Sequence, residues 1–159
     1  MGDEESKAIA RAKNRAYRLL TFRPRSRSEL AAKLLEKDFD DAVVEAVLAD
    51  LARLGYINDR QFAEQWASGR IRLRGFGRRR IEQELRNKGI DREIVGEALG
   101  QAFGADTEAE TAHKEAEKKL NIMKSADRET RRRRLAGFLE RKGFSYDVIR
   151  IVLKDTDCI

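Results

Sequence analysis

The side chains best suited to chemistry in this sequence are arginines, which fall into three clusters. A guanidinium group stays charged at all ordinary pH values and binds phosphates and carboxylates through paired hydrogen bonds. We predict that these clusters contact DNA or an acidic protein surface. The alternative is that they solubilise helix ends or form internal ion pairs, worth about 0–1 kcal/mol each. The candidate residues are Arg25, Arg27, Arg70, Arg72, Arg74, Arg78, Arg79, Arg80, Arg131, Arg132, Arg133 and Arg134.

The overall charge agrees with an anionic partner. Lys and Arg outnumber Asp and Glu by 34 to 28, and the charged fraction of 39% predicts that much of the chain is helix surface facing water. No apolar run reaches the roughly 18 residues of a membrane span, and the chain begins with the acidic segment Gly2–Glu5 rather than a secretion signal. We therefore expect a monomeric cytoplasmic protein that makes no contact with membranes.

Residue types that build active sites are scarce in this chain. Cys158 is the single cysteine and His113 the single histidine, so the sequence predicts no disulfide framework, no metal site and no cofactor. No Ser/His/Asp set or Cys/His pair is visible either. We predict that the protein is not an enzyme, that Cys158 is an incidental thiol and that His113 is a solvated side chain.

The segment Arg74-Gly75-Phe76-Gly77-Arg78 superficially suggests a phosphate-binding loop. No Gly-Lys-Ser/Thr follows it, and the preceding segment has the pattern of a helix rather than a strand. We predict a turn between two basic helices, with Phe76 buried beneath it rather than stacked on a base. The other core aromatics are expected to be Tyr17, Phe22, Phe62, Trp66, Phe103 and Phe138, with Trp66 anchoring the middle of the chain.

A pattern that occurs three times defines the elements that must position the arginines. In each copy two apolar residues lie four apart, a lysine follows three later, and a turn comes next. Further apolar residues spaced i, i+1, i+4 and i+5 then form one stripe of a second helix. The three copies of the first part are Leu30, Leu34, Lys37; Ile81, Leu85, Lys88; and Leu135, Leu139, Lys142.

Helix start and stop signals extend the pattern to nine helices. Ser26 with Glu29 and Thr107 with Glu110 form capping boxes, and Asn58 and Ser145 are further N-caps. The predicted fold is all-α: three tandem three-helix repeats, at 1–56, 57–104 and 105–159, packed into an elongated, curved array. The helices are expected at 6–21, 27–37, 41–54, 59–73, 78–88, 92–103, 107–122, 126–142 and 146–154.

Three motifs in this chain resemble a known family. Arg23, Ser26, Glu29 and Leu30 are similar to an Arg-x-x-Ser-x-x-Glu-Leu signature. The segment 55–63 resembles a Gly-Tyr-Leu-Asp-Asp-x-x-Phe-Ala motif, with Asn58 in place of the usual Asp. A central block is matched by Gly75, Gly77, Arg80, Ile81, Glu84, Leu85, Lys88, Gly89 and Ile90. These motifs belong to the RecX regulatory family, which the third unit matches in length and repeat pattern.

This resemblance implies a function that composition alone does not name. It implies an all-helical modulator that lies in the groove of the RecA–DNA filament and usually suppresses its ATPase, strand-exchange and co-protease activities in DNA repair and the SOS response. Weak binding to single- or double-stranded DNA is also implied. The alternatives are a plain nucleic-acid-binding helical protein and an enzyme.

Overall fold

A computed structural model describes residues 2–104 and 107–156, except for the side chain of Thr107. These residues form nine α-helices and no strand, and each predicted helix is present with its ends within three residues of the expected range. None of these helices is both long and apolar enough to cross a bilayer. The helices are α1 (Asp3–Phe22), α2 (Arg27–Leu35), α3 (Asp41–Arg53), α4 (Asp59–Arg74), α5 (Arg78–Asn87), α6 (Arg92–Phe103), α7 (Thr107–Ile122), α8 (Arg128–Lys142) and α9 (Tyr146–Thr156).

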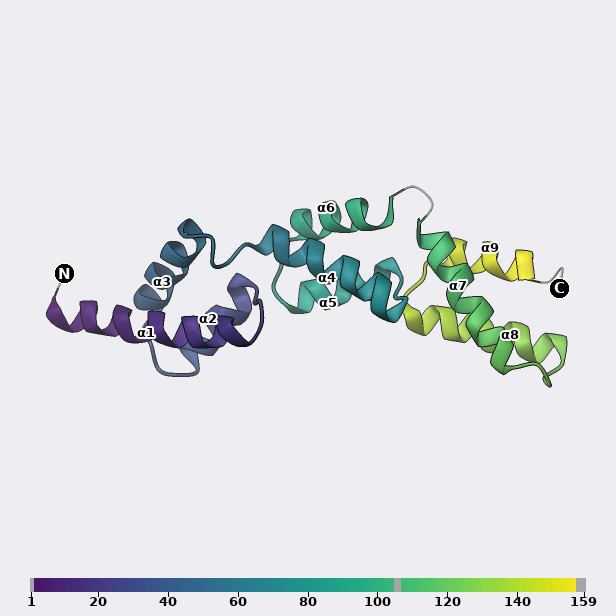
Figure 1. Ribbon diagram of the computed structural model, residues 1–159, viewed down its shortest axis with the longest axis horizontal. Helices are drawn as coiled ribbons and strands as arrows, with labels where there is room; N and C mark the ends of the chain where they lie inside the picture. The colour runs from purple at the N-terminus through teal and green to yellow at the C-terminus, as the bar shows by residue number, and fades with distance from the viewer. Residues whose placement is uncertain (1, 105–106, 157–159) are drawn as a thin grey trace.

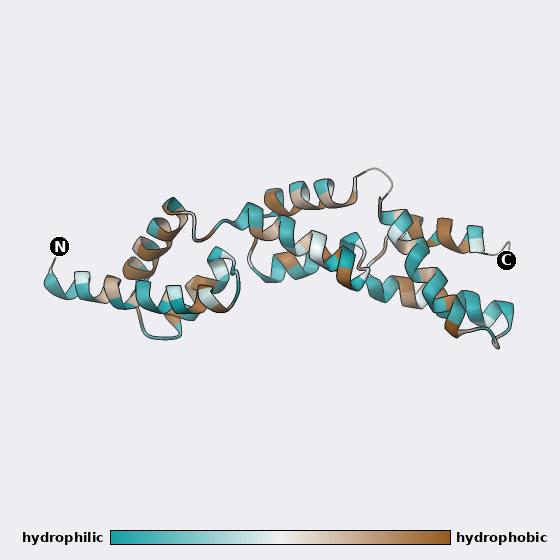
Figure 2. Cartoon of the chain, in the orientation of Figure 1, coloured by the Kyte–Doolittle hydropathy of each residue, from teal (hydrophilic) through white to brown (hydrophobic). Residues whose placement is uncertain are grey.

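The nine helices form three successive groups along an elongated molecule, with the two ends of the chain far apart (Figure 1). We call α1–α3 unit one, α4–α6 unit two and α7–α9 unit three. Each unit has its own apolar cluster, and the repeated residues Leu30, Ile81 and Leu135 are at most 1% exposed. Figure 2 shows apolar residues along α3 and hydrophilic ones at the free start of α1.

Several predicted helix caps are present. The Glu29 backbone N–H donates to Ser26 Oγ at 3.1 Å, and the Ser26 N–H donates to Glu29 Oε2 at the same distance, which completes the capping box. Asn58 accepts from the Gln61 N–H at 3.1 Å, and Ser145 accepts from the Val148 N–H at 3.4 Å. The capping box predicted at Thr107 and the thiol of Cys158 lie outside the described residues.

The prediction that Phe22 belongs to a core is wrong, because its side chain is 85% exposed. In α1 the buried residues are Ala12 and Ala16. Phe22 comes six residues after Ala16, which places it about 240° around the helix from that residue. The other predicted core aromatics are buried or pack against their unit's cluster.

Units one and two meet where the N-terminus of α2 abuts the C-terminus of α5. Ser26 Oγ donates to the Lys88 carbonyl oxygen at 2.6 Å, and the Arg27 N–H donates to Asp59 Oδ1 at 2.8 Å. The Ser26 hydroxyl thus satisfies a free carbonyl at the C-terminus of α5, and the Asp59 carboxylate satisfies a free N–H at the N-terminus of α2. We call this contact the first joint.

The second joint has the same polarity, with the N-terminus of α5 on the C-terminus of α8. The Gly77 N–H donates to the Lys142 carbonyl at 2.8 Å, and the Arg79 N–H donates to the Gly143 carbonyl at 3.0 Å. The second helices of the three units therefore follow one another head to tail. This arrangement places the predicted basic clusters of units one and two at the joints.

The lysine of the repeat closes both joints. The Lys88 ammonium donates to Glu29 Oε1 at 2.9 Å across the first joint. Across the second, the Lys142 ammonium donates to the Arg74 carbonyl at 2.6 Å and also to Glu115 Oε2, which lies on its own unit, at 2.9 Å. These contacts account for the repeated lysine in units two and three.

We expect acid to weaken the first joint. Burial would raise the pKa of Glu29, but hydrogen bonds from Arg23, Lys88 and the Ser26 N–H outweigh it and lower the pKa to about 2. A carboxylate with a depressed folded-state pKa stabilises the fold fully above its unfolded value of 4.5, and this stabilisation disappears as the pH falls toward 2. The loss should reach up to about 3 kcal/mol in the free energy of unfolding, measured by urea denaturation at successive pH values.

The variant Glu29→Gln should remove most of this pH dependence and should be less stable than the wild type at neutral pH. The matched control is Glu64→Gln, because Glu64 is exposed on α4 and forms no ion pair within the described ranges. If Glu29→Gln shows the same acid transition as the wild type, Glu29 is not the group responsible.

Candidate partner-binding surface

The twelve candidate arginines differ in what they contact in the structure. Arg70 is integral to unit two, since its Nε lies 2.7 Å from Glu84 Oε2 and its guanidinium lies 4.2 Å from the centre of the Trp66 ring. The Trp66 indole N–H donates to the same carboxylate oxygen at 2.9 Å. These contacts also support Trp66 as an anchor of the middle unit, where it stacks on Phe62.

Arg78 and Arg80 contribute to the second joint. The Arg78 N–H donates to Glu108 Oε1 at 3.1 Å, and Arg80 Nη1 donates to the Arg141 carbonyl at 3.1 Å. The Arg80 guanidinium covers the Phe76 ring at 3.8 Å from its centre, and Phe76 is only 9% exposed. The prediction that Phe76 is buried beneath a helix–helix turn is confirmed.

The arginines near the start of α2 also have internal partners. Arg25 Nε donates to the Leu19 carbonyl at 3.4 Å, and Arg27 pairs with Glu45 at 2.7 Å. The Arg27 pair is largely exposed, so it contributes little to stability. Its side chain is therefore held weakly and can exchange Glu45 for an external anion.

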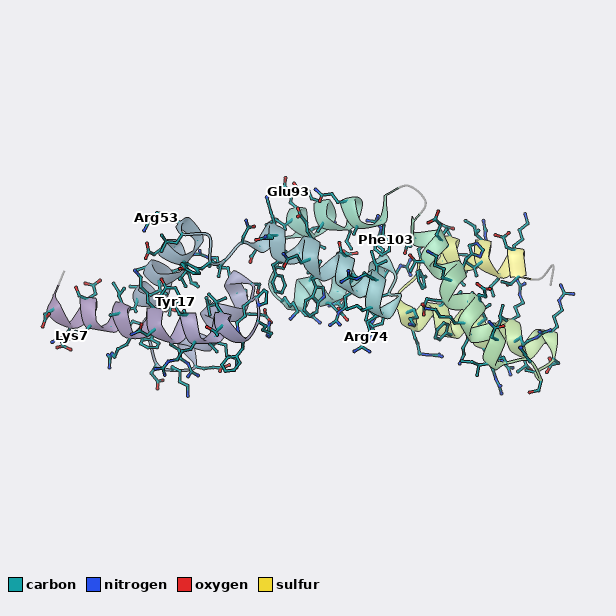
Figure 3. The ribbon with its side chains drawn as sticks, viewed as in Figure 1. Lys7, Tyr17, Arg53, Arg74, Glu93 and Phe103 are labelled. Atoms are coloured by element: carbon teal, nitrogen blue, oxygen red, sulfur yellow. The ribbon has the colours of Figure 1, made fainter. Side chains whose placement is uncertain are left out.

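Three arginines remain exposed at the second joint without such a partner. The side chains of Arg72, Arg74 and Arg79 make no hydrogen bond or ion pair with the residues that the structure describes. Arg74 points away from the ribbon where α4 approaches unit three (Figure 3). Leu73, between two of them, is 74% exposed. We call Arg72, Arg74 and Arg79 the free arginines.

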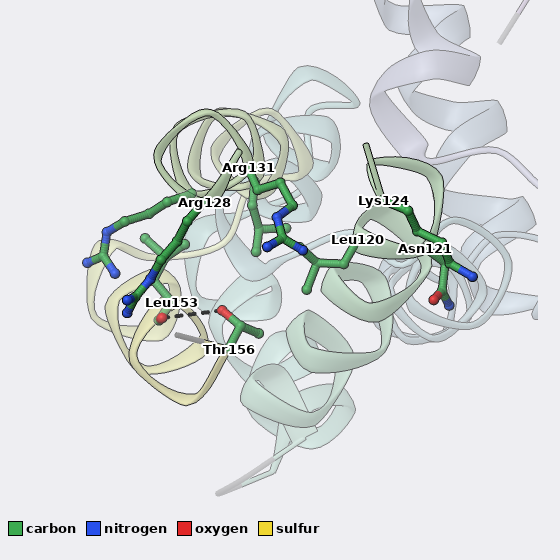
Figure 4. Close-up of a pocket in the computed structure, with 9 residues that line it drawn as sticks. Leu120, Asn121, Lys124, Arg128, Arg131, Leu153 and Thr156 are labelled. Atoms are coloured by element: carbon green, nitrogen blue, oxygen red, sulfur yellow. Dashed lines mark hydrogen bonds between the residues drawn. The ribbon is translucent and has the colours of Figure 1, made fainter. Parts of the chain in front are cut away.

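The third cluster surrounds α8, because four successive helical positions lie about 100° apart. Arg131 and Arg132 line a pocket of about 300 Å³ between α7, α8 and α9. Figure 4 shows Arg128 and Arg131 on one side of this pocket, with Leu120 and Leu153 forming its apolar part. Arg133 and Arg134 line a different groove, between α7 and α8.

Sequence reasoning missed two residues of this second groove, Lys119 and Arg141. They lie fourteen and eight residues from Arg133, each in a basic pair, Lys118-Lys119 and Arg141-Lys142, that is shorter than the predicted clusters. Packing of α7 against α8 brings Lys119 beside Arg133 and Arg134 (Figure 1), whereas Arg141 lies on α8 itself, seven residues after Arg134 and therefore on the same face of the helix. We call this the α7–α8 groove.

The side chains that suggest metal or acid–base chemistry are dispersed. His113 Nε2 lies 3.2 Å from Asp155 Oδ2, and the histidine is partly exposed rather than fully solvated. Within residues 2–104 and 107–156, no group of three or more His, Cys, Asp or Glu side chains is arranged to hold a metal ion.

The fold and its joints define an all-helical protein of tandem three-helix units. The three RecX three-helix domains match residues 12–51, 58–99 and 106–153, in order. The regulatory protein RecX of Amycolatopsis mediterranei is 36% identical over 145 residues, covering 91% of this chain and 82% of that protein. RecX of Corynebacterium efficiens is 40% identical over 161 residues, covering 96% of this chain and 75% of the relative.

A solved structure agrees with these relatives. The crystal structure of RecX from Lactobacillus salivarius superimposes with a TM-score of 0.87 and 27% identity, covering 97% of this chain and 99% of that one. The chain therefore belongs to the RecX family of regulatory proteins. The predicted family and the predicted fold of three tandem three-helix units are both confirmed.

Proposed function

We propose that this protein regulates the RecA recombinase by binding in the groove of the RecA–DNA filament and lowering its ATPase, strand-exchange and co-protease activities. Its proposed setting is DNA repair and the SOS response in the cytoplasm, where it acts as a monomer without a cofactor. The observation that carries the proposal is the head-to-tail row of second helices, with the free arginines exposed at the second joint of a RecX-family chain.

The physical basis of the proposal is multivalency. A filament presents the same surfaces repeatedly, and an elongated chain of three similar units can contact several of them at once. Linking weak contacts in this way raises the overall affinity without requiring a deep pocket. The joints contribute by fixing the spacing of the units. The Lys88–Glu29 ion pair crosses the first joint, and two backbone hydrogen bonds and the contact from Lys142 to the Arg74 carbonyl cross the second.

A second candidate is plain DNA binding, which the net charge of +6 and the exposed guanidinium groups favour. The two candidates differ in their response to salt. Binding to naked single-stranded DNA should weaken by about 0.7 log unit per log unit of salt for each phosphate contact. A filament regulator should instead bind assembled RecA more tightly than DNA alone.

We expect RecA ATPase activity on single-stranded DNA to fall to a plateau as this protein is titrated in. The measurement is the steady-state rate of ATP hydrolysis at fixed RecA and DNA. In parallel, fluorescence anisotropy should show weaker binding to the same DNA without RecA. Unchanged ATPase at a stoichiometric ratio would contradict regulation, and equal affinity for naked DNA would favour the second candidate.

A further inference from the structure

The α7–α8 groove is a second basic surface, separate from the free arginines at the joint. It has a volume of about 580 Å³ and lies between the C-terminal end of α7, the loop that follows and the exposed side of α8. Its lining residues come from three consecutive segments of unit three. They are Lys119, Ile122, Met123, Ser125, Ala126, Arg133, Arg134, Gly137 and Arg141.

The charge of the groove has one sign. Four of its lining residues are basic and none is acidic. The guanidinium groups of Arg133, Arg134 and Arg141 form no ion pair with the part of the chain that the structure describes. Converging charges of one sign raise the local concentration of oppositely charged ligands. The groove is therefore suited to an anion.

Its floor is apolar and partly open. Ile122 is 79% exposed, whereas the neighbouring Met123 is 7% exposed and offers a flexible thioether side chain. Gly137, inside α8, also lines the groove, and a Cβ there would lie only 3.2 Å from Arg141 Nη1. Glycine inside a helix costs about 1 kcal/mol relative to alanine, and here it leaves room for that guanidinium to lie across the helix.

The position of the aromatic ring near the groove argues against a nucleic acid as its ligand. Sequence-tolerant binding of single strands depends on aromatic rings on which bases stack. The aromatic ring beside this groove, Phe138, is partly buried and has the Lys119 and Lys142 ammonium groups at 5.4 Å from its centre. An exposed isoleucine with arginines around it instead suits an aliphatic side chain flanked by carboxylates.

We propose that the α7–α8 groove binds an acidic protein segment that carries an aliphatic side chain. The carboxylates pair with Arg133, Arg134 and Arg141, and the aliphatic group packs on Ile122 and Met123. This inference goes beyond the proposed function, because it concerns unit three alone and does not require the segment to belong to RecA. It also does not use the free arginines at the second joint.

The test is fluorescence anisotropy with two labelled probes, a peptide of repeated Glu-Glu-Leu and an oligothymidylate. Wild-type protein should bind the peptide, and Arg133→Ala with Arg134→Ala should weaken that binding at least about tenfold. Ile122→Asp should also weaken it, because an added carboxylate repels the peptide and removes the apolar contact. The matched control, Arg86→Ala with Arg150→Ala, removes two exposed charges elsewhere and should change affinity less than about twofold.

Three results would overturn this assignment. The first is failure of the wild-type protein to bind the peptide. The second is an equal loss of peptide binding in the control variant, which would indicate attraction by net charge alone. The third is selective loss of oligothymidylate binding when Arg133 and Arg134 are replaced, which would assign the groove to nucleic acid. Circular dichroism should show unchanged helicity in every variant, since the replaced side chains are exposed. The RecA ATPase assay is independent of all these outcomes.

Discussion

Replacing Gly77 with alanine is expected to detach unit three from unit two. A Cβ at this position would lie 2.5 Å from the backbone of Gly143 and Phe144, where main-chain atoms cannot move aside as a flexible side chain could. The φ angle of Gly77 is −81°, which any residue adopts, so the expected effect comes from packing alone. Loss of the two backbone hydrogen bonds across the joint should bring the destabilisation to about 2–4 kcal/mol.

In Gly77→Ala, urea denaturation should show two separate unfolding steps in place of one. Small-angle X-ray scattering should show a larger radius of gyration than that of the wild type. The control is Gly100→Ala on the exposed face of α6, where a Cβ meets nothing within 4 Å. That substitution should stabilise the protein by about 0.5–1 kcal/mol, because alanine favours helix more than glycine does. Equal stability of Gly77→Ala and wild type would show that the second joint does not hold the units together.

The local elements were predictable because their signals lie close together in the chain. The buried residues Leu30, Ile81 and Leu135 each repeat with an apolar partner four residues later, and this spacing alone predicts a helix with one inward face. The cap at Ser26 likewise depends on Glu29, three residues away. The family motifs then supplied the function, which no periodic pattern contains.

The joints were not predictable, because they depend on residues that are far apart in the sequence. Lys88 contacts Glu29 across 59 positions, and Lys142 contacts the Arg74 carbonyl across 68. An arginine whose side chain closes a joint and one whose side chain faces solvent have the same local pattern, as Arg80 and Arg79 illustrate. The exposure of Phe22 was missed because its aromatic character was weighed above its position, about 240° around α1 from the buried Ala16.

The second large effect is expected from Arg72→Ala, Arg74→Ala and Arg79→Ala combined. These exposed side chains make no hydrogen bond or ion pair with the described residues, so the variant should keep its helicity and unfolding midpoint. If each guanidinium contributes about 0.5–1 kcal/mol to the filament contact, inhibition of RecA ATPase should require about 10- to 100-fold more protein. The half-inhibitory concentration, measured beside the wild type, tests this expectation.

The matched control is Arg11→Ala, Arg18→Ala and Arg92→Ala, which removes three exposed charges from α1 and α6. Equal loss of inhibition in both variants would mean that net charge acts rather than the free arginines. The dependence of inhibition on salt concentration then shows whether the free arginines contact DNA or RecA. The slope in question is that of the logarithm of the binding constant against the logarithm of the salt concentration. Loss of three contacts to single-stranded phosphates should reduce its magnitude by about 2, since each contact contributes about 0.7. An unchanged slope with weaker inhibition would place these arginines on RecA itself, because a protein contact releases no condensed counterions from DNA.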